Sequence, residues 1–105
     1  MAVINTNDAD FKKELIQHPL VAIKYFADWC GSCKLIAPKY RRLSDDARFA
    51  NIRFLEVDAE VNEEVRKSAQ VDNLPYFAIF KDGVFVGGAA TSKEEKIVEL
   101  LGKLS

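Results

Sequence analysis

The sequence predicts an α/β domain of three layers, in which helices cover both faces of a central mixed sheet in the order βαβαβαββα. Short apolar runs typical of buried strands alternate along the chain with segments of helical periodicity. Near the end, Asp82-Gly83 separates two apolar runs, which is a strong signal for an antiparallel hairpin. Because 105 residues leave room for one core, we expect a single domain over residues 1–105.

The first part of the chain predicts two strands with a helix between them. Residues 3–5 indicate a short edge strand, and Asn7 is placed to cap a helix whose apolar residues lie four apart. The run Leu20–Phe26 is almost continuously apolar, as expected of a central strand covered on both faces. Lys24 is the only charged residue in this predicted strand.

The middle of the chain predicts a long helix, a strand and a short helix. From Ser32 onward, apolar residues recur at helical spacing up to Leu43. Pro38 lies inside this predicted helix, where a proline is expected to cause a kink. Residues 52–57 then indicate another buried strand. Residues 62–69 indicate a polar helix that packs through a narrow face, with Val61 and Val65 four apart.

The last part predicts the hairpin and a closing helix. Residues 76–80 and 84–86 form the two antiparallel strands. Either Thr91 or Ser92 is followed three residues later by a glutamate, the pattern of a capping box at a helix start. The apolar stripe of this helix comprises Ile97, Leu100, Leu101 and Leu104.

Charge and composition exclude several classes of function. The net charge is -1, from 15 basic and 16 acidic residues, so no positive field attracts the chain to nucleic acid or to anionic lipid. Charged residues within the first 20 positions interrupt any apolar run that a signal peptide or membrane span would need. We therefore expect a cytoplasmic protein with neither nucleic acid nor membrane as a partner.

The two cysteines, Cys30 and Cys33, are spaced Cys-x-x-Cys. A secreted disulfide framework needs more cysteines, and a four-ligand zinc site needs two further donors that the single histidine, His18, does not complete. The spacing alone leaves half a metal site or two inert thiols as alternatives. Redox chemistry is the interpretation with the fewest objections.

The motif lies between a predicted strand and a predicted helix, which places Cys30 at the helix N-terminus. Free N–H groups and the helix dipole there favour a thiolate, so Cys30 is the expected nucleophile. Cys33 follows about one turn later, within reach of a disulfide. Gly31 and Ser32 are too small to block a substrate, and Trp29, otherwise a core aromatic, is expected to lie over the site.

These residues resemble the thioredoxin family over essentially the whole chain. Residues 27–34 (ADWCGSCK) resemble the family's Trp-Cys-Gly-Pro-Cys-Lys site. Four further matches follow in the family's order: FLEVD at 54–58 for the third strand, Leu74-Pro75 for the cis-proline turn, FKDG at 80–83 for the hairpin, and Gly87 for a glycine beside the site.

The resemblance implies a thioredoxin fold and a protein-disulfide reductase that binds no cofactor itself. Leu74-Pro75 would be a cis bond opposite Cys30, and the Leu74 backbone would pair with a substrate strand. Electrons would come from an NADPH-dependent thioredoxin reductase, and the substrates would be disulfide-containing proteins. We expect the chain to act as a monomer.

Three positions depart from the family pattern. Ser32 replaces the usual proline between the cysteines, so the reduction potential does not transfer from the family. Lys24 replaces a buried aspartate that is thought to help deprotonate the second cysteine. It either titrates low enough to serve as a base when desolvated, or pairs with Glu56 and stays charged, which we favour. The pair then either takes over the proton-transfer role or leaves Lys24 as a snorkelling lysine that only packs. Tyr76 replaces a smaller threonine, and its ring either reshapes the substrate groove or turns into the core.

Two alternatives to a reductase come from other classes. One is a redox-silent binding module of thioredoxin-like fold, which the retention of both cysteines opposes. The other is an iron-sulfur or metal carrier that shares Cys30 ligands across a dimer, which Pro75 beside the motif opposes.

Overall fold

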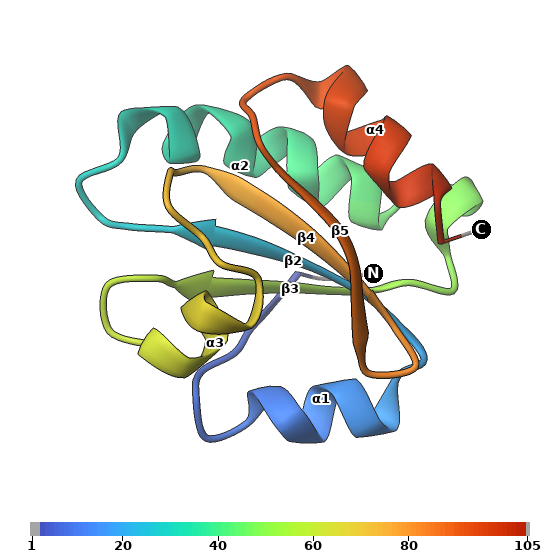
Figure 1. Ribbon diagram of the computed structural model, residues 1–105. Helices are drawn as coiled ribbons and strands as arrows, with labels where there is room; N and C mark the ends of the chain where they lie inside the picture. The colour runs from blue at the N-terminus through green and yellow to red at the C-terminus, as the bar shows by residue number, and fades with distance from the viewer. Residues whose placement is uncertain (1–2, 105) are drawn as a thin grey trace.

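The computed structural model describes residues 3–104, so residues 1, 2 and 105 of the predicted span lie outside the described residues. Helices and strands alternate in the first part of the chain, and a hairpin precedes the last helix (Figure 1). The elements are β1 (Ile4–Asn5), α1 (Phe11–Gln17), β2 (Leu20–Phe26), α2 (Gly31–Ser44), a 3-10 turn (Ala47–Phe49), β3 (Arg53–Asp58), α3 (Glu63–Ser68), β4 (Tyr76–Lys81), β5 (Val84–Ala90) and α4 (Glu94–Gly102).

The strands form one mixed sheet in the order β1-β3-β2-β4-β5. β3 is parallel to β1 and β2, whereas β4 is antiparallel to both β2 and β5. β2 is therefore central, and five of its seven residues are buried. The hairpin turn between β4 and β5 has positive φ at Asp82 (52°) and Gly83 (82°), as a tight Asp-Gly turn requires.

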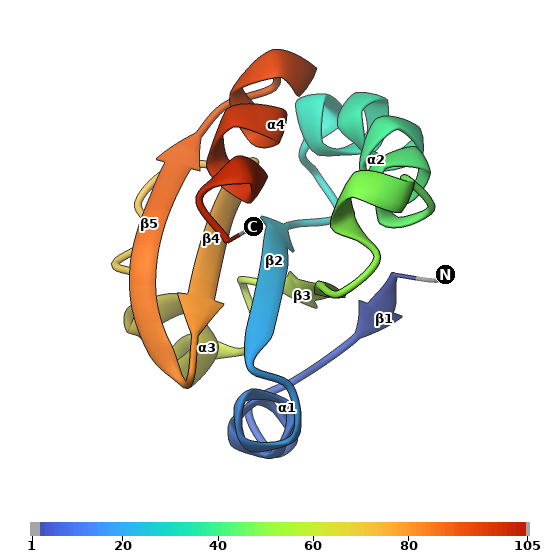
Figure 2. The same ribbon diagram turned by 90° about the vertical axis from the view of Figure 1, so that its right-hand side faces the viewer.

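Helices cover both faces of the sheet (Figures 1 and 2). α2 and α4 pack on one face over a core that includes Tyr40, Phe54 and Leu101. α1 and α3 lie on the opposite face over a second core that includes Phe11 and Val65. The architecture confirms the predicted three-layer α/β/α fold. Within residues 3–104, no helix is long and apolar enough to cross a membrane.

The starts of two helices differ from the sequence-based prediction. Asn7 does not cap α1 directly: its Oδ1 accepts a hydrogen bond from the Asp10 N–H (2.9 Å), which closes a turn before the helix begins at Phe11. The predicted capping box of α4 is also wrong, because the N-cap residue is Lys93 and its side chain makes no cap. Thr91 Oγ1 instead accepts from the Lys93 N–H.

α3 is fixed by a contact that is distant in sequence. The Asp8 carboxylate accepts hydrogen bonds from the N–H groups of Glu64 and Val65 at the start of this helix. Val65 is fully buried, whereas Val61 is 74% exposed and takes no part in the predicted narrow face. The position of α3 is therefore fixed by the packing of Val65 and by the Asp8 carboxylate at the positive, N-terminal end of the helix.

Candidate active site

Cys30 lies where the chain leaves the central strand and enters α2. Its N–H donates to the carbonyl of Ala27 (3.1 Å), which closes a turn after β2. Cys30 then adopts an extended conformation and serves as the N-cap residue of α2, which begins at Gly31. Its sulfur is therefore at the positive end of a helix of 14 residues.

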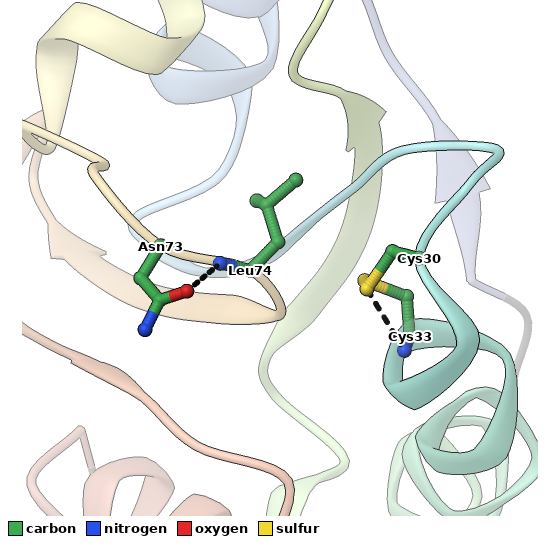
Figure 3. The surroundings of a disulfide bond; sticks show 4 residues. All are labelled: Cys30, Cys33, Asn73 and Leu74. Atoms are coloured by element: carbon green, nitrogen blue, oxygen red, sulfur yellow. Dashed lines mark hydrogen bonds between the residues drawn. A yellow bond between two sulfur atoms is a disulfide. The ribbon is translucent and has the colours of Figure 1, made fainter.

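Cys30 and Cys33 are joined by a disulfide, with their Cα atoms 5.3 Å apart (Figure 3). The Cys33 N–H donates to Cys30 Sγ, with a separation of 3.2 Å. Helix N-termini leave such N–H groups without intrahelical partners, and a thiolate accepts from them more strongly than a thiol does. The predicted pairing is therefore present, and the geometry favours ionisation of Cys30 once the bond is reduced.

The disulfide is largely buried, but exposed residues border it. Cys30 and Cys33 are only 5% and 3% exposed, and they form a small apolar cluster with Ala27 against which Leu74 packs. Gly31 and Ser32 are exposed in the first turn of the helix. Trp29 is 69% exposed, so it is not a core aromatic and is available to a partner protein.

The loop before β4 forms the opposite wall of the site. The Leu74–Pro75 bond is cis, as the family resemblance implies. Pro75 is buried, and its carbonyl accepts from the Thr91 N–H (3.2 Å), which ties the loop to the end of β5. This tie holds Leu74 against the disulfide cluster.

Lys24 is paired with Glu56, as expected from the sequence. The side chain of Lys24 is 5% exposed, and its Nζ lies 3.2 Å from Glu56 Oε1 on the neighbouring strand, where the two residues are in register. Two aromatic rings face the ammonium: its distances to the ring centroids of Phe26 and Tyr40 are 5.6 Å and 5.7 Å. The carboxylate and the rings together compensate a buried charge.

A cavity of about 260 Å³ connects this ion pair with the second cysteine. It is open to solvent and large enough for several water molecules. Its walls come from the end of β2, the first turns of α2 and β3. The lining residues are Lys24, Phe26, Ala27, Asp28, Cys33, Lys34, Ala37, Arg41 and Glu56. Proton exchange between Cys33 and the ion pair is therefore geometrically possible.

Tyr40 belongs to this environment, although the sequence indicated only a core position at helical spacing. It is fully buried, and its hydroxyl donates to the carbonyl of Leu55 (3.0 Å). Burial raises the pKa of Tyr40 well above its ordinary value, and the Glu56 carboxylate adds to that rise. Tyr40 therefore contributes a neutral ring and a fixed hydroxyl beside Lys24.

The structure corrects the prediction that Gly87 lies beside the site. Gly87 pairs with Ile79, well along β4 from Pro75, and a Cβ added to it would meet Leu100 of α4. The residue that pairs with the start of β4 is Ala90.

Tyr76 is only partly buried and packs against the edge of the second core, which is nearer to the second of the two interpretations of the sequence. Its ring makes an edge contact with the ring of Tyr25 (5.8 Å between centroids). It also lies over Gly88, where an added Cβ would come within 2.8 Å of the ring carbon Cε1. Partial burial raises the pKa of Tyr76, and the nearby Asp72 carboxylate adds to the effect.

The two adjacent glycines of β5 are expected to respond differently to alanine. Gly88→Ala should lower the free energy of unfolding by about 1 kcal/mol, because the partly buried Tyr76 ring must move. Gly87→Ala should change it little, because its nearest contact is an ordinary 3.4 Å to Leu100, and should leave disulfide reduction intact. Urea denaturation of both variants measures the difference, and equal destabilisation would contradict the packing described.

The described residues hold no cluster of three or more histidine, cysteine or acidic side chains that could bind a metal ion. The site instead offers two sulfurs that can be joined or separate, a helix terminus that stabilises the outer one as a thiolate, and a cis-proline loop facing them. A site of this kind on an α/β sheet defines the class of dithiol–disulfide oxidoreductases.

Comparison with known proteins gives the family. The family model described as thioredoxin matches residues 2–103. The chain is 31% identical to Thioredoxin 1 of Plasmodium falciparum, over 98% of this chain and 97% of that protein. It is 38% identical to Thioredoxin-2 of Pyricularia oryzae, over 91% of this chain but only 55% of that protein. The chain belongs to the thioredoxin family.

Solved structures agree with this assignment. The thioredoxin of Schistosoma mansoni superposes with a TM-score of 0.89 at 31% identity, over 99% of this chain and 96% of that one. The thioredoxin of Plasmodium falciparum gives the same TM-score at 29% identity, over 98% of this chain and 100% of that one. The fold is the thioredoxin fold, and with its cysteine pair the protein is a protein disulfide oxidoreductase, an enzyme of the protein-disulfide reductase type.

Proposed function

We propose that the protein reduces disulfides in other proteins by attack of the Cys30 thiolate. Cys30 Sγ bonds to one substrate sulfur, the substrate disulfide breaks, and the other substrate sulfur leaves as a thiolate that takes up a proton. Cys33 then loses its proton and attacks Cys30 Sγ, which releases the second substrate thiol and closes the Cys30–Cys33 disulfide. The observation that supports this order is the position of Cys30 Sγ at the helix N-cap, where the Cys33 N–H points at it.

Two electrons must then return to the protein in each cycle. We infer an NADPH-dependent thioredoxin reductase as their source, because the chain belongs to the family that such reductases serve. We further propose that the protein works as a monomer in the cytoplasm, where a reducing poise favours the dithiol form.

Substrate contact is proposed for the residues that surround the disulfide at the surface. Trp29 and the small residues Gly31 and Ser32 flank the approach to Cys30, and Pro75 supports the facing loop. The Leu74 backbone is proposed to pair with an extended substrate segment, because it is not part of the sheet and lies against the disulfide cluster. Tyr76 is proposed to act indirectly, by supporting this loop through its contact with Tyr25.

Lys24 and Glu56 are proposed to assist the second step. Cys33 is buried and must lose a proton before it attacks, and the open cavity joins it to the ion pair. Glu56 is 30% exposed in its side chain and so has access to solvent for proton exchange, whereas the enclosed Lys24 holds the carboxylate in place. This division of roles gives the pair the function that the aspartate has in the family.

A coupled assay tests the proposed function. NADPH, a purified thioredoxin reductase and a disulfide-containing protein such as insulin are combined, and NADPH oxidation is followed with and without this chain. We expect oxidation to depend on the chain and to continue over many turnovers. Reduction of insulin with dithiothreitol as the donor, but not with the reductase, would refute only the proposed electron donor. No acceleration with either donor would refute the reductase function.

A further inference from the structure

In the loop that faces the disulfide, a backbone N–H donates a hydrogen bond to a side chain of the same loop. Asp72 to Pro75 lie outside the helices and strands, and β4 begins at Tyr76. The Leu74 N–H donates to Oδ1 of Asn73, the preceding residue, with a separation of 3.0 Å. In Figure 3, Leu74 lies between Asn73 and the disulfide. The Leu74 amide of the loop that faces the disulfide is thus occupied by a side chain of the protein itself.

The other backbone groups of this loop show why that amide matters. Pro75 has no N–H, and its carbonyl is already bonded to Thr91. Among residues 3–104, no backbone or side-chain donor reaches the Leu74 carbonyl. An extended peptide that binds beside Cys30 would therefore find one free acceptor and one occupied donor at Leu74. For the peptide to form both main-chain hydrogen bonds with Leu74, the Asn73 side chain must first release the Leu74 N–H.

Asn73 is well placed to release the Leu74 N–H. Asn73 and its hydrogen bond to Leu74 are both exposed to solvent. Water can therefore hydrogen-bond to the Asn73 side-chain amide when that side chain moves away from Leu74. A typical hydrogen bond of this kind is worth roughly a two- to tenfold change in an equilibrium constant. A peptide carbonyl can therefore displace Asn73, but at a measurable loss of affinity.

We propose that Asn73 is a specificity-determining residue that competes with substrate for the Leu74 N–H. This inference rests on the proposed function, in which the Leu74 backbone pairs with an extended substrate. Substrates that offer a main-chain carbonyl at the right place displace the Asn73 side chain. Small disulfides without a peptide backbone do not need the Leu74 amide, so Asn73 does not affect them.

Two variants change the competition in opposite directions. Asn73→Ala removes the competing oxygen, so KM for an oxidised, uncharged peptide disulfide should fall about two- to tenfold. Asn73→Asp supplies a charged acceptor, which binds an N–H more strongly, so KM for the same peptide should rise. For both variants kcat/KM with hydroxyethyl disulfide should stay at the wild-type value. Asn51→Ala, at an exposed asparagine in another turn, is the matched control.

Dithiothreitol regenerates the dithiol in all these assays, so the result does not depend on a reductase. Faster hydrogen exchange of the Leu74 amide in Asn73→Ala than in wild type would confirm that the bond forms in solution. The inference is overturned if the two variants shift KM for the peptide in the same direction, leave it unchanged, or alter both substrates equally. Failure of the wild-type protein to reduce either substrate would instead refute the proposed function, and with it the role of Asn73.

Discussion

Replacement of Cys33 by serine is expected to stop turnover, with a fall in the rate of substrate reduction of at least about a thousandfold. Cys30 keeps its place at the N-cap of α2, so its attack on a substrate disulfide still occurs. The hydroxyl of serine cannot displace the substrate sulfur, and the mixed disulfide accumulates. Intact-protein mass spectrometry should find one substrate chain bound per molecule, released again by dithiothreitol.

Cys30→Ser is the matched control for this experiment. It should lose turnover to the same extent but form little mixed disulfide, because the remaining sulfur at Cys33 lies inside the first turn of the helix and lacks the N-cap position that favours a thiolate at Cys30. Trapping on Cys33 in that variant, at a rate similar to trapping on Cys30, would contradict the assignment of Cys30 as the nucleophile.

The core of the fold could be predicted because its signals are local. The run Leu20–Phe26 matches β2 at both ends, since a continuous apolar stretch of this length fits a strand covered on both faces. The Asp82-Gly83 pair identified the hairpin, because few other residue pairs tolerate positive φ at both positions. The alternation of such strands with helical segments then leaves the three-layer architecture as the natural solution.

The length and register of β5 depend on its pairing with β4, which no local sequence pattern indicates. β5 continues through Gly87 and Gly88 to Ala90, although these small residues have little strand propensity, because pairing with β4 imposes the conformation. An irregularity between Ile79 and Phe80 shifts the register of this pair. Sequence order alone therefore could not place Gly87 correctly relative to the disulfide.

In the candidate site too, some features could be predicted from local sequence patterns, whereas others depend on contacts between distant segments. The cysteine spacing, together with its place at a predicted helix start, predicted the disulfide, and adjacent buried strands predicted the Lys24–Glu56 pair. Tyr40 beside Lys24 was recognised only as a core residue, because its approach depends on how α2 crosses the sheet. The contact of Asn73 with the Leu74 amide depends on the path of an irregular loop, which residue spacing does not determine.

Lys24→Met is expected to slow the closing of the Cys30–Cys33 disulfide on the order of a hundredfold at neutral pH, the usual size of a lost acid-base contribution. Methionine fills a similar volume among the same rings, and Glu56, being partly exposed, remains hydrated, so stability should change little. The slowing should diminish as the pH rises past about 8.5, where an ordinary thiol ionises without help. Stopped-flow measurement of mixed-disulfide resolution from pH 6 to 10 gives the profile. A Lys24→Met profile that coincides with wild type would remove the pair from the mechanism.

Among changes at this site, Glu56→Ala is expected to lower the free energy of unfolding most. Together with the double variant, it separates the structural role of the Lys24–Glu56 pair from its role in proton exchange. It leaves the ammonium of Lys24, only 5% exposed, without its carboxylate. Breaking a fully buried ion pair costs about 3–5 kcal/mol, and the two aromatic rings and the solvent-open cavity beside Lys24 keep the loss below that range. The double variant Lys24→Met with Glu56→Ala removes that charge, so it should recover most of the free energy of unfolding. Resolution of the mixed disulfide should nevertheless stay as slow as in Lys24→Met, because the proton-exchanging pair is absent. Recovery of the rate together with stability would mean that the pair only supports the fold.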